Sequence, residues 1–142
     1  MGDIPRGNRP LSPHLQVYRL PISAVTSIMN RITGHAMLAG VILIVWWLVA
    51  AVTSDHAFGW ADWVMRSWFG FLVLALSMWA LWFHFLAGIR HFFYDAGHML
   101  EIDEGQKSSW AIIWGSVILT LISLLLFFLA WDPRFPCATS PP

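Results

Sequence analysis

Three long apolar stretches constrain this chain more than any other feature. They cover about residues 31–53, 68–94 and 110–131, and a helix needs about 20 apolar residues to cross a bilayer. Because backbone polar groups inside lipid must be hydrogen-bonded within their own segment, each stretch is expected to be a helix. Only 11% of the residues are charged and 58% are hydrophobic, a balance that is typical of membrane proteins. The sequence predicts an all-α membrane protein with three transmembrane helices.

The segments around the spans complete this prediction. Residues 1–30 form an N-terminal segment and the start of the first helix, and residues 31–142 form one three-span membrane domain. Polar residues interrupt the apolar pattern between Ser54 and Asp62, where Trp60 and Trp63 are predicted interfacial anchors. The most polar stretch, EIDEGQKSS at residues 101–109, is predicted to be a loop.

Positive charges predict how the spans are oriented. Three spans place the two termini on opposite sides of the membrane. One side would carry Arg6, Arg9, Arg19, Arg31, Arg90 and Lys107, and the other only Arg66 and Arg134. Because loops rich in Lys and Arg stay in the cytoplasm, the N-terminus is predicted to be cytoplasmic.

Charge and cysteine content exclude other classes of site. The formal net charge is zero, so no basic face for nucleic acid is expected. Cys137 is the only cysteine, which excludes an internal disulfide and the cysteine clusters of zinc and iron–sulfur centres. The first thirty residues contain four prolines and no continuous apolar core, so neither a secretory signal nor a transit peptide is expected.

The second span carries ionisable residues in the sequence HFLAGIRHFFYDAG, residues 84–97. His84, His91 and His98 are spaced seven apart, so they would lie along one face of a helix together with Asp95. If Tyr94 lies near the interface, His84 lies about 15 Å deeper. Ionisable groups at that depth are costly and are usually functional.

Three uses of such a histidine stay open: haem ligation, proton relay and a hydrogen bond to a neighbouring helix. Ala80, Ala87 and Gly88 lie on the same face as His84, and small residues there favour haem, because they let a flat macrocycle approach the helix. They would equally suit close helix packing.

A second ligand within this chain is not expected. His35 on the first span lies only about 6 Å inside Arg31 by the helical rise, so we expect it not to meet His84 at one depth. The partner ligand of His84 would then come from another chain. His91 matches His35 in depth, and for both a structural or haem-propionate-facing role is favoured over ligation.

The first span begins with SIMNRITG, residues 27–34. Ser27 and Arg31 are four apart and share one helical face. A hydroxyl beside a cation can bind a carbonyl oxygen such as that of a quinone. An arginine at the cytoplasmic end of a span is, however, most commonly an anchor to lipid phosphate.

Together, RPLSPHLQVY (9–18), SIMNRITG (27–34) and HFLAGIRHFFYDAG (84–97) resemble the cytochrome b membrane-anchor subunit of succinate dehydrogenase, respiratory complex II, the larger of its two anchors. The resemblance implies that His84 is an axial ligand of haem b, with the opposite ligand supplied by a second, smaller anchor subunit. It also implies that Ser27 and Arg31 border a ubiquinone site. Members of the family often carry a histidine where this chain has Asn30, which puts any haem-propionate contact from that position in doubt.

The resemblance further implies a flavoprotein that oxidises succinate and an iron–sulfur subunit that passes electrons to ubiquinone. This chain would carry no succinate chemistry. The missing transit peptide favours the bacterial inner membrane over the mitochondrial one. Three rival functions remain: the anchor of a fumarate-reducing, quinol-oxidising complex, a haem-free proton- or ion-conducting membrane protein, and a structural anchor without a cofactor.

Overall fold

The computed structural model describes residues 7, 12, 14 and 17–130. Within these residues the chain forms four helices and no strand: α1 (Ile22–Thr53), α2 (Asp55–Arg66), α3 (Trp68–Asp95) and α4 (Ile102–Ala130). Helices α1, α3 and α4 are each long and apolar enough to cross a membrane. This confirms the predicted all-α, three-span fold. Parts of the RPLSPHLQVY motif, the end of the third span at Trp131, and Cys137 lie outside the described residues.

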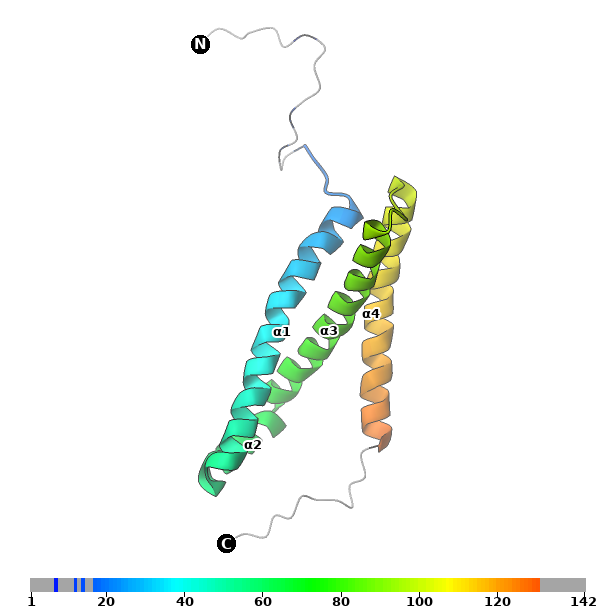
Figure 1. Cartoon of the computed structure of the whole chain (residues 1–142). Coiled ribbons are helices and arrows are strands. Elements are labelled where there is room, and N and C mark those ends of the chain that lie inside the picture. Colours follow the sequence, from blue (N-terminus) through cyan, green and yellow to red (C-terminus); the bar gives the residue numbers. More distant parts are fainter. Residues whose placement is uncertain (1–6, 8–11, 13, 15–16, 131–142) are drawn as a thin grey trace, which may run out of the picture.

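The three long helices form a bundle in which α3 lies between α1 and α4 (Figure 1). The short helix α2 connects α1 to α3 at one end of the bundle. Helix α1 begins at the opposite end from α2, and α4 ends near the α2 end. The chain therefore passes along the bundle three times, as the sequence predicts.

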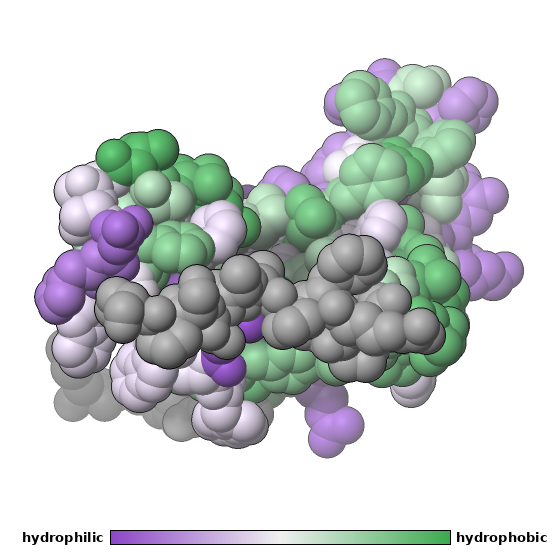
Figure 2. All heavy atoms as spheres, turned by 90° about the horizontal axis from the view of Figure 1, so that it is seen from below, coloured by the Kyte–Doolittle hydropathy of each residue, from purple (hydrophilic) through white to green (hydrophobic). Residues whose placement is uncertain are grey.

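The interior of the bundle is built from a small apolar core and small residues. Phe83, Ala87 and Ile112 form the core between α3 and α4, while large apolar side chains such as Leu38 and Leu121 are exposed. Seen end-on from below, apolar side chains cover much of the outer sides of the bundle (Figure 2). In lipid an apolar side chain gains nothing by turning inward, so small residues that allow close backbone approach take the interior.

Helix α1 begins nine residues before the apolar run that predicted the first span. Pro21 precedes it with φ −65°, and the Pro21 carbonyl accepts hydrogen bonds from the amides of Ala24 and Val25. Proline suits this position because its fixed φ matches a helix and no amide is lost from the ladder. The 32 residues of α1 span about 48 Å at the helical rise. Arg31 therefore lies inside the helix and not at its end.

The break predicted at residues 54–62 is mostly helical, because helix α2 (Asp55–Arg66) begins in it; the sequence pattern does not predict this helix. Ser54 caps it by accepting a hydrogen bond of 3.2 Å from the amide of Ala57, and Asp62 pairs with Arg66 at 2.7 Å. The tryptophans at 60 and 63 are exposed and pack edge to face. Their exposure agrees with the predicted interfacial anchors.

The prediction of a loop at residues 101–109 is wrong, because α4 begins at Ile102. Asp103 and Glu104 lie in its first turn, where negative side chains favour the positive end of the helix dipole. Gly105 and Ser109 are buried. The acidic residues of this stretch thus favour the start of a helix, and its buried residues pack against the bundle.

Candidate functional site

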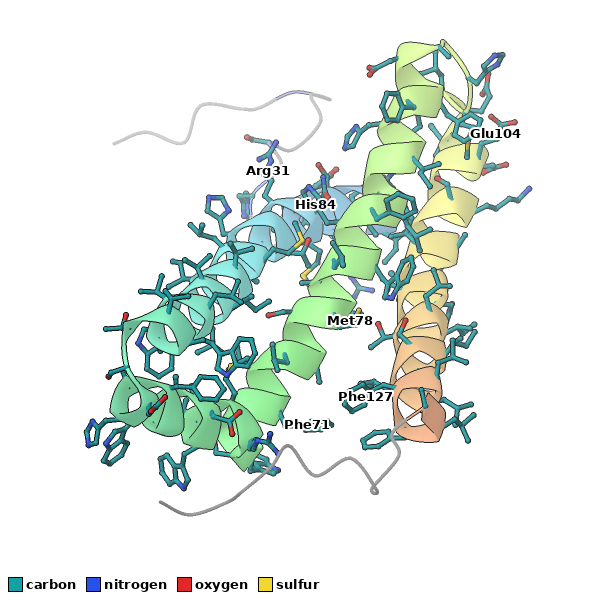
Figure 3. The ribbon with its side chains drawn as sticks, turned by 60° about the horizontal axis from the view of Figure 1, so that its bottom comes forward. Arg31, Phe71, Met78, His84, Glu104 and Phe127 are labelled. Atoms are coloured by element: carbon teal, nitrogen blue, oxygen red, sulfur yellow. The ribbon has the colours of Figure 1, made fainter. Side chains whose placement is uncertain are left out.

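His84 is a half-buried residue of α3 whose ring lies against the backbone of α1. Its Nδ1 is 3.1 Å from the carbonyl oxygen of Asn30. One helical turn further along α1, a Cβ added to Gly34 would stand 3.2 Å from Cε1 of the ring. Figure 3 shows Arg31 and His84 in the same region, where α1 passes α3. The absence of a side chain at Gly34 is what allows the imidazole to lie this close to α1.

The bond to Asn30 fixes the tautomer of His84. A carbonyl oxygen only accepts hydrogen bonds, so Nδ1 carries the proton and donates it. Nε2 then keeps its lone pair, which is the form in which a histidine binds a metal. A hydrogen bond from the second ring nitrogen also orients metal-binding histidines and makes them more basic. Such a ring would be able to ligate a haem iron through Nε2.

The predicted difference in depth between His84 and His35 is wrong. His84 contacts Asn30 and faces Gly34, so it lies at the level of the α1 turn that leads to His35. The prediction measured the two depths from different residues, Arg31 on the first span and Tyr94 on the second. These do not lie at one level, because Arg90, four residues before Tyr94, already contacts Thr26, five residues before Arg31. His35 instead leaves α1 about 100° around the axis from Gly34, is exposed, and has its Nδ1 2.7 Å from the carbonyl of Arg31. The two histidines are kept apart by the direction in which the His35 side chain leaves α1, and not by a difference in depth.

Ser27 and Arg31 lie on one face of α1, as predicted from their spacing. Ser27 is half-buried and Arg31 is exposed. The residue before Ser27, Thr26, is fully buried in the bundle. Ser27 therefore lies at the edge between the packed face of α1 and its outer surface, where its hydroxyl and the guanidinium of Arg31 are available to a ligand beside the bundle.

Two of the three small residues near His84 are used for helix packing. Ala80 and Ala87 are 1% and 0% exposed, which means that the chain's own helices cover them. Gly88 is different, because a Cβ added there would meet no atom within 4 Å. The alternative of close packing thus holds for the two alanines, and Gly88 alone lines open space.

The predicted stripe of ionisable residues ends before His98. The amide of Gly97 bonds the carbonyl of Tyr94, and the amide of His98 bonds that of Phe93; with φ +77° at Gly97, this pattern is a Schellman motif that ends α3 at Asp95. His98 is therefore not on the helix. His91 is exposed and packs edge to face against Tyr94, with ring centroids 6.2 Å apart.

Arg90 is the residue whose position the sequence reasoning missed. The charge pattern assigns it to the cytoplasmic boundary, yet it is only 4% exposed. Its Nη1 donates to Thr26 Oγ1 at 3.0 Å and to Ser109 Oγ at 2.8 Å. These hydroxyls belong to α1 and α4. No spacing rule along the sequence links them to Arg90, so only the tertiary structure reveals the contact.

Comparison with known proteins agrees with this fold. A family model described as succinate dehydrogenase/fumarate reductase transmembrane subunit matches residues 5–123. The chain is 67% identical over 128 residues to the succinate dehydrogenase cytochrome b556 subunit of Paracoccus denitrificans, covering 90% of this chain and 98% of that protein. It is 32% identical over 114 residues to the cytochrome b556 subunit of Rickettsia felis (80% and 89% covered).

A relative with the cytochrome b560 name also matches. The chain is 36% identical over 125 residues to the succinate dehydrogenase cytochrome b560 subunit of Reclinomonas americana, covering 84% of this chain and 87% of that protein. The family match includes α1, α2, α3 and most of α4. The chain therefore belongs to the succinate dehydrogenase/fumarate reductase transmembrane subunit family, as a membrane anchor of the succinate dehydrogenase cytochrome b type.

Proposed function

We propose that this chain anchors a succinate:ubiquinone oxidoreductase in the bacterial inner membrane, with its N-terminus in the cytoplasm. It supplies His84 as one axial ligand of haem b and borders a ubiquinone site with Ser27 and Arg31. The observation that carries the proposal is the hydrogen bond between His84 Nδ1 and the Asn30 carbonyl at 3.1 Å. It leaves Nε2 unprotonated on a ring that is already oriented.

The site is incomplete within one chain, which is the reason for a second anchor subunit. Haem b takes two axial ligands. His35 leaves α1 in a different direction from Gly34, the residue that faces His84, so it is not placed to be the second ligand. The second ligand is therefore assigned to a smaller anchor subunit. When bound, the haem supplies a one-electron carrier within the membrane. His91, exposed at the same end of α3 as Arg90, is assigned to the surroundings of the haem propionates.

Ubiquinone binding is assigned to the face of α1 that carries Ser27 and Arg31. A hydroxyl and a guanidinium can both donate to a quinone carbonyl oxygen, whose negative charge grows as the quinone is reduced. A flavoprotein and an iron–sulfur subunit would deliver the electrons of succinate to this site. The names of the relatives favour succinate oxidation; the family description also includes fumarate reductase, for which the same anchor geometry would serve.

The test is a reduced-minus-oxidised spectrum of the purified complex with haem quantified per flavin. A b-type spectrum is expected, and His84→Ala should remove most of the haem. His35→Ala is the matched control. His35 directly follows Gly34 in α1, but its side chain does not face His84. Unaltered haem content in His84→Ala, or equal loss in His35→Ala, would reject the ligand assignment. A complex without any haem that conducts protons in liposomes would favour the ion-conducting alternative.

A further inference from the structure

Arg90 is a buried cation whose partners come from three helices. In the described part of the chain no carboxylate lies within ion-pair distance of its guanidinium. Instead its Nη1 donates to Thr26 Oγ1 of α1 and Ser109 Oγ of α4, and its Cζ lies 5.6 Å from the centre of the Tyr94 ring. These four residues are called the Arg90 cluster. Because a buried charge without acceptors is costly, the cluster allows little freedom in where α1 and α4 lie against α3.

The hydroxyl protons in the cluster have acceptors of their own. Ser109 donates to the carbonyl of Gly105 at 2.7 Å, and Thr26 Oγ1 lies 3.0 Å from the carbonyl of Ser23 and 3.2 Å from Ser109 Oγ, either of which can accept its proton. With their protons used in this way, both oxygens present lone pairs to Nη1.

Thr26 connects the cluster to the proposed quinone site, since it precedes Ser27 directly. Thr26 is fully buried, so its bond to Arg90 fixes both the rotation of α1 about its axis and its position along α3. A rotation that released Thr26 would also turn Ser27 and Arg31 away from their present direction. The apolar core of Phe83, Ala87 and Ile112 joins α3 to α4, but apolar contacts define rotation less sharply than a bond between two fixed atoms.

We propose that Arg90 is a positioning residue of the quinone site: through Thr26 and Ser109 it holds the start of α1 at the rotation that presents Ser27 and Arg31 to ubiquinone. This inference rests on the proposed function of Ser27 and Arg31. It assigns Arg90 no contact with the quinone and no part in haem binding. The contact between His84 and the carbonyl of Asn30, one turn further along α1, stays in place, so the effect should appear in quinone binding and not in haem content.

The test uses Thr26→Val in the intact purified complex, because valine keeps the branched shape and removes the acceptor. Succinate:ubiquinone activity should show a KM for ubiquinone raised about tenfold, the effect of one charge-assisted hydrogen bond to the quinone being lost when the start of α1 turns away. Succinate oxidation by an artificial acceptor and haem per flavin should stay at the levels of the unchanged complex. Thr26→Ser keeps the hydroxyl and should restore a normal KM.

Ser123→Ala is the matched control, since Ser123 of α4 accepts a hydrogen bond of 3.0 Å from Trp82 Nε1 of α3, away from Ser27. An unchanged KM in Thr26→Val, or an equal rise in Ser123→Ala, would overturn the proposal. If Thr26→Val fails to assemble, Ser109→Ala, which removes the acceptor on α4, and Arg90→Lys decide by the same criteria. If Ser27→Ala and Arg31→Ala leave quinone kinetics unchanged, the quinone-site assignment itself fails, independently of the result for Thr26.

Discussion

His84 of α3 lies against Gly34 of α1 so closely that a Cβ at residue 34 would stand 3.2 Å from Cε1 of the imidazole. The Asn30 carbonyl, one turn earlier, accepts a hydrogen bond from Nδ1. Two backbone features of α1 thus determine where this ring lies: a missing side chain and an oriented carbonyl. If His84 ligates haem, both features determine the position of its Nε2.

Gly34→Ala is expected to displace the His84 ring by a few tenths of an ångström. A displaced side chain of this kind costs about 0.5–1.5 kcal/mol, so haem affinity should fall about two- to tenfold. The α band and the midpoint potential of the haem should shift. Both are measured on the purified complex.

Gly115→Ala is the control for Gly34→Ala. A Cβ at Gly115 would stand 3.1 Å from a methyl group of Leu86, an equally short contact with a side chain that can move. Both changes add a methyl group to a helix and raise its propensity alike. A spectrum unchanged in Gly34→Ala, or changed equally in Gly115→Ala, would contradict the proposed role of Gly34.

Asn30→Ala is expected to leave the haem spectrum unchanged. His84 bonds the main-chain carbonyl of Asn30, which the substitution retains, and the side-chain Oδ1 is buried without a partner. The measurement is haem per flavin and the position of the α band. Haem loss as large as that in His84→Ala would show that the Asn30 side chain, and not its carbonyl, supports the ligand.

Ser27→Ala and Arg31→Ala should each lower ubiquinone reductase activity while leaving succinate oxidation by an artificial acceptor intact. Loss of one hydrogen bond costs about 0.5–1.5 kcal/mol for the hydroxyl and about 1.5–3 kcal/mol for the charged donor. The expected loss in kcat/KM for ubiquinone is therefore roughly two- to tenfold for Ser27 and roughly ten- to hundredfold for Arg31. Ile32→Ala, at an exposed neighbouring position, should change neither activity. Equal loss of both activities would indicate misassembly.

Ser54→Ala should loosen the start of α2. Ser54 accepts a hydrogen bond from the amide of Ala57, and loss of such a cap costs about 1 kcal/mol. Hydrogen exchange of the first amides of α2 should become about fivefold faster, as that free energy predicts. Ser54→Asp retains the acceptor and should keep exchange slow. Ser67→Ala, which removes the cap of α3 at Gly70 and a bond to Val64 in the last turn of α2, should leave the first amides of α2 unchanged.

Local sequence patterns were sufficient for the long helices, and they singled out His84 as a candidate functional residue. Apolar runs of spanning length predicted α1, α3 and α4, because lipid leaves a backbone no other way to satisfy its polar groups. His84 stood out because an ionisable residue deep in such a run is costly. The spacing of Ser27 and Arg31 placed both on one face of a helix, which the structure also has.

Hydropathy alone misplaced the ends of the helices. Residues 102–109 are polar yet helical, because acidic residues suit a first turn and the buried Gly105 and Ser109 face the bundle. The start of α1 at Ile22 also lies ahead of the apolar window that began near Arg31. His84 was placed at the wrong level relative to His35 because the depths were measured from Arg31 on one helix and from Tyr94 on the other.

The sequence by itself determined three crossings, the interruption between the first two, and the choice of His84 as the candidate haem ligand, since length, composition and helical periodicity are local properties. Only the tertiary structure decided which backbone atoms hold that histidine and that Arg90 is buried between the helices. Asn30 lies 54 residues from His84, and Thr26 lies 64 residues from Arg90. Contacts at such separations depend on how helices rotate and pack against one another, which no periodicity along a single helix specifies.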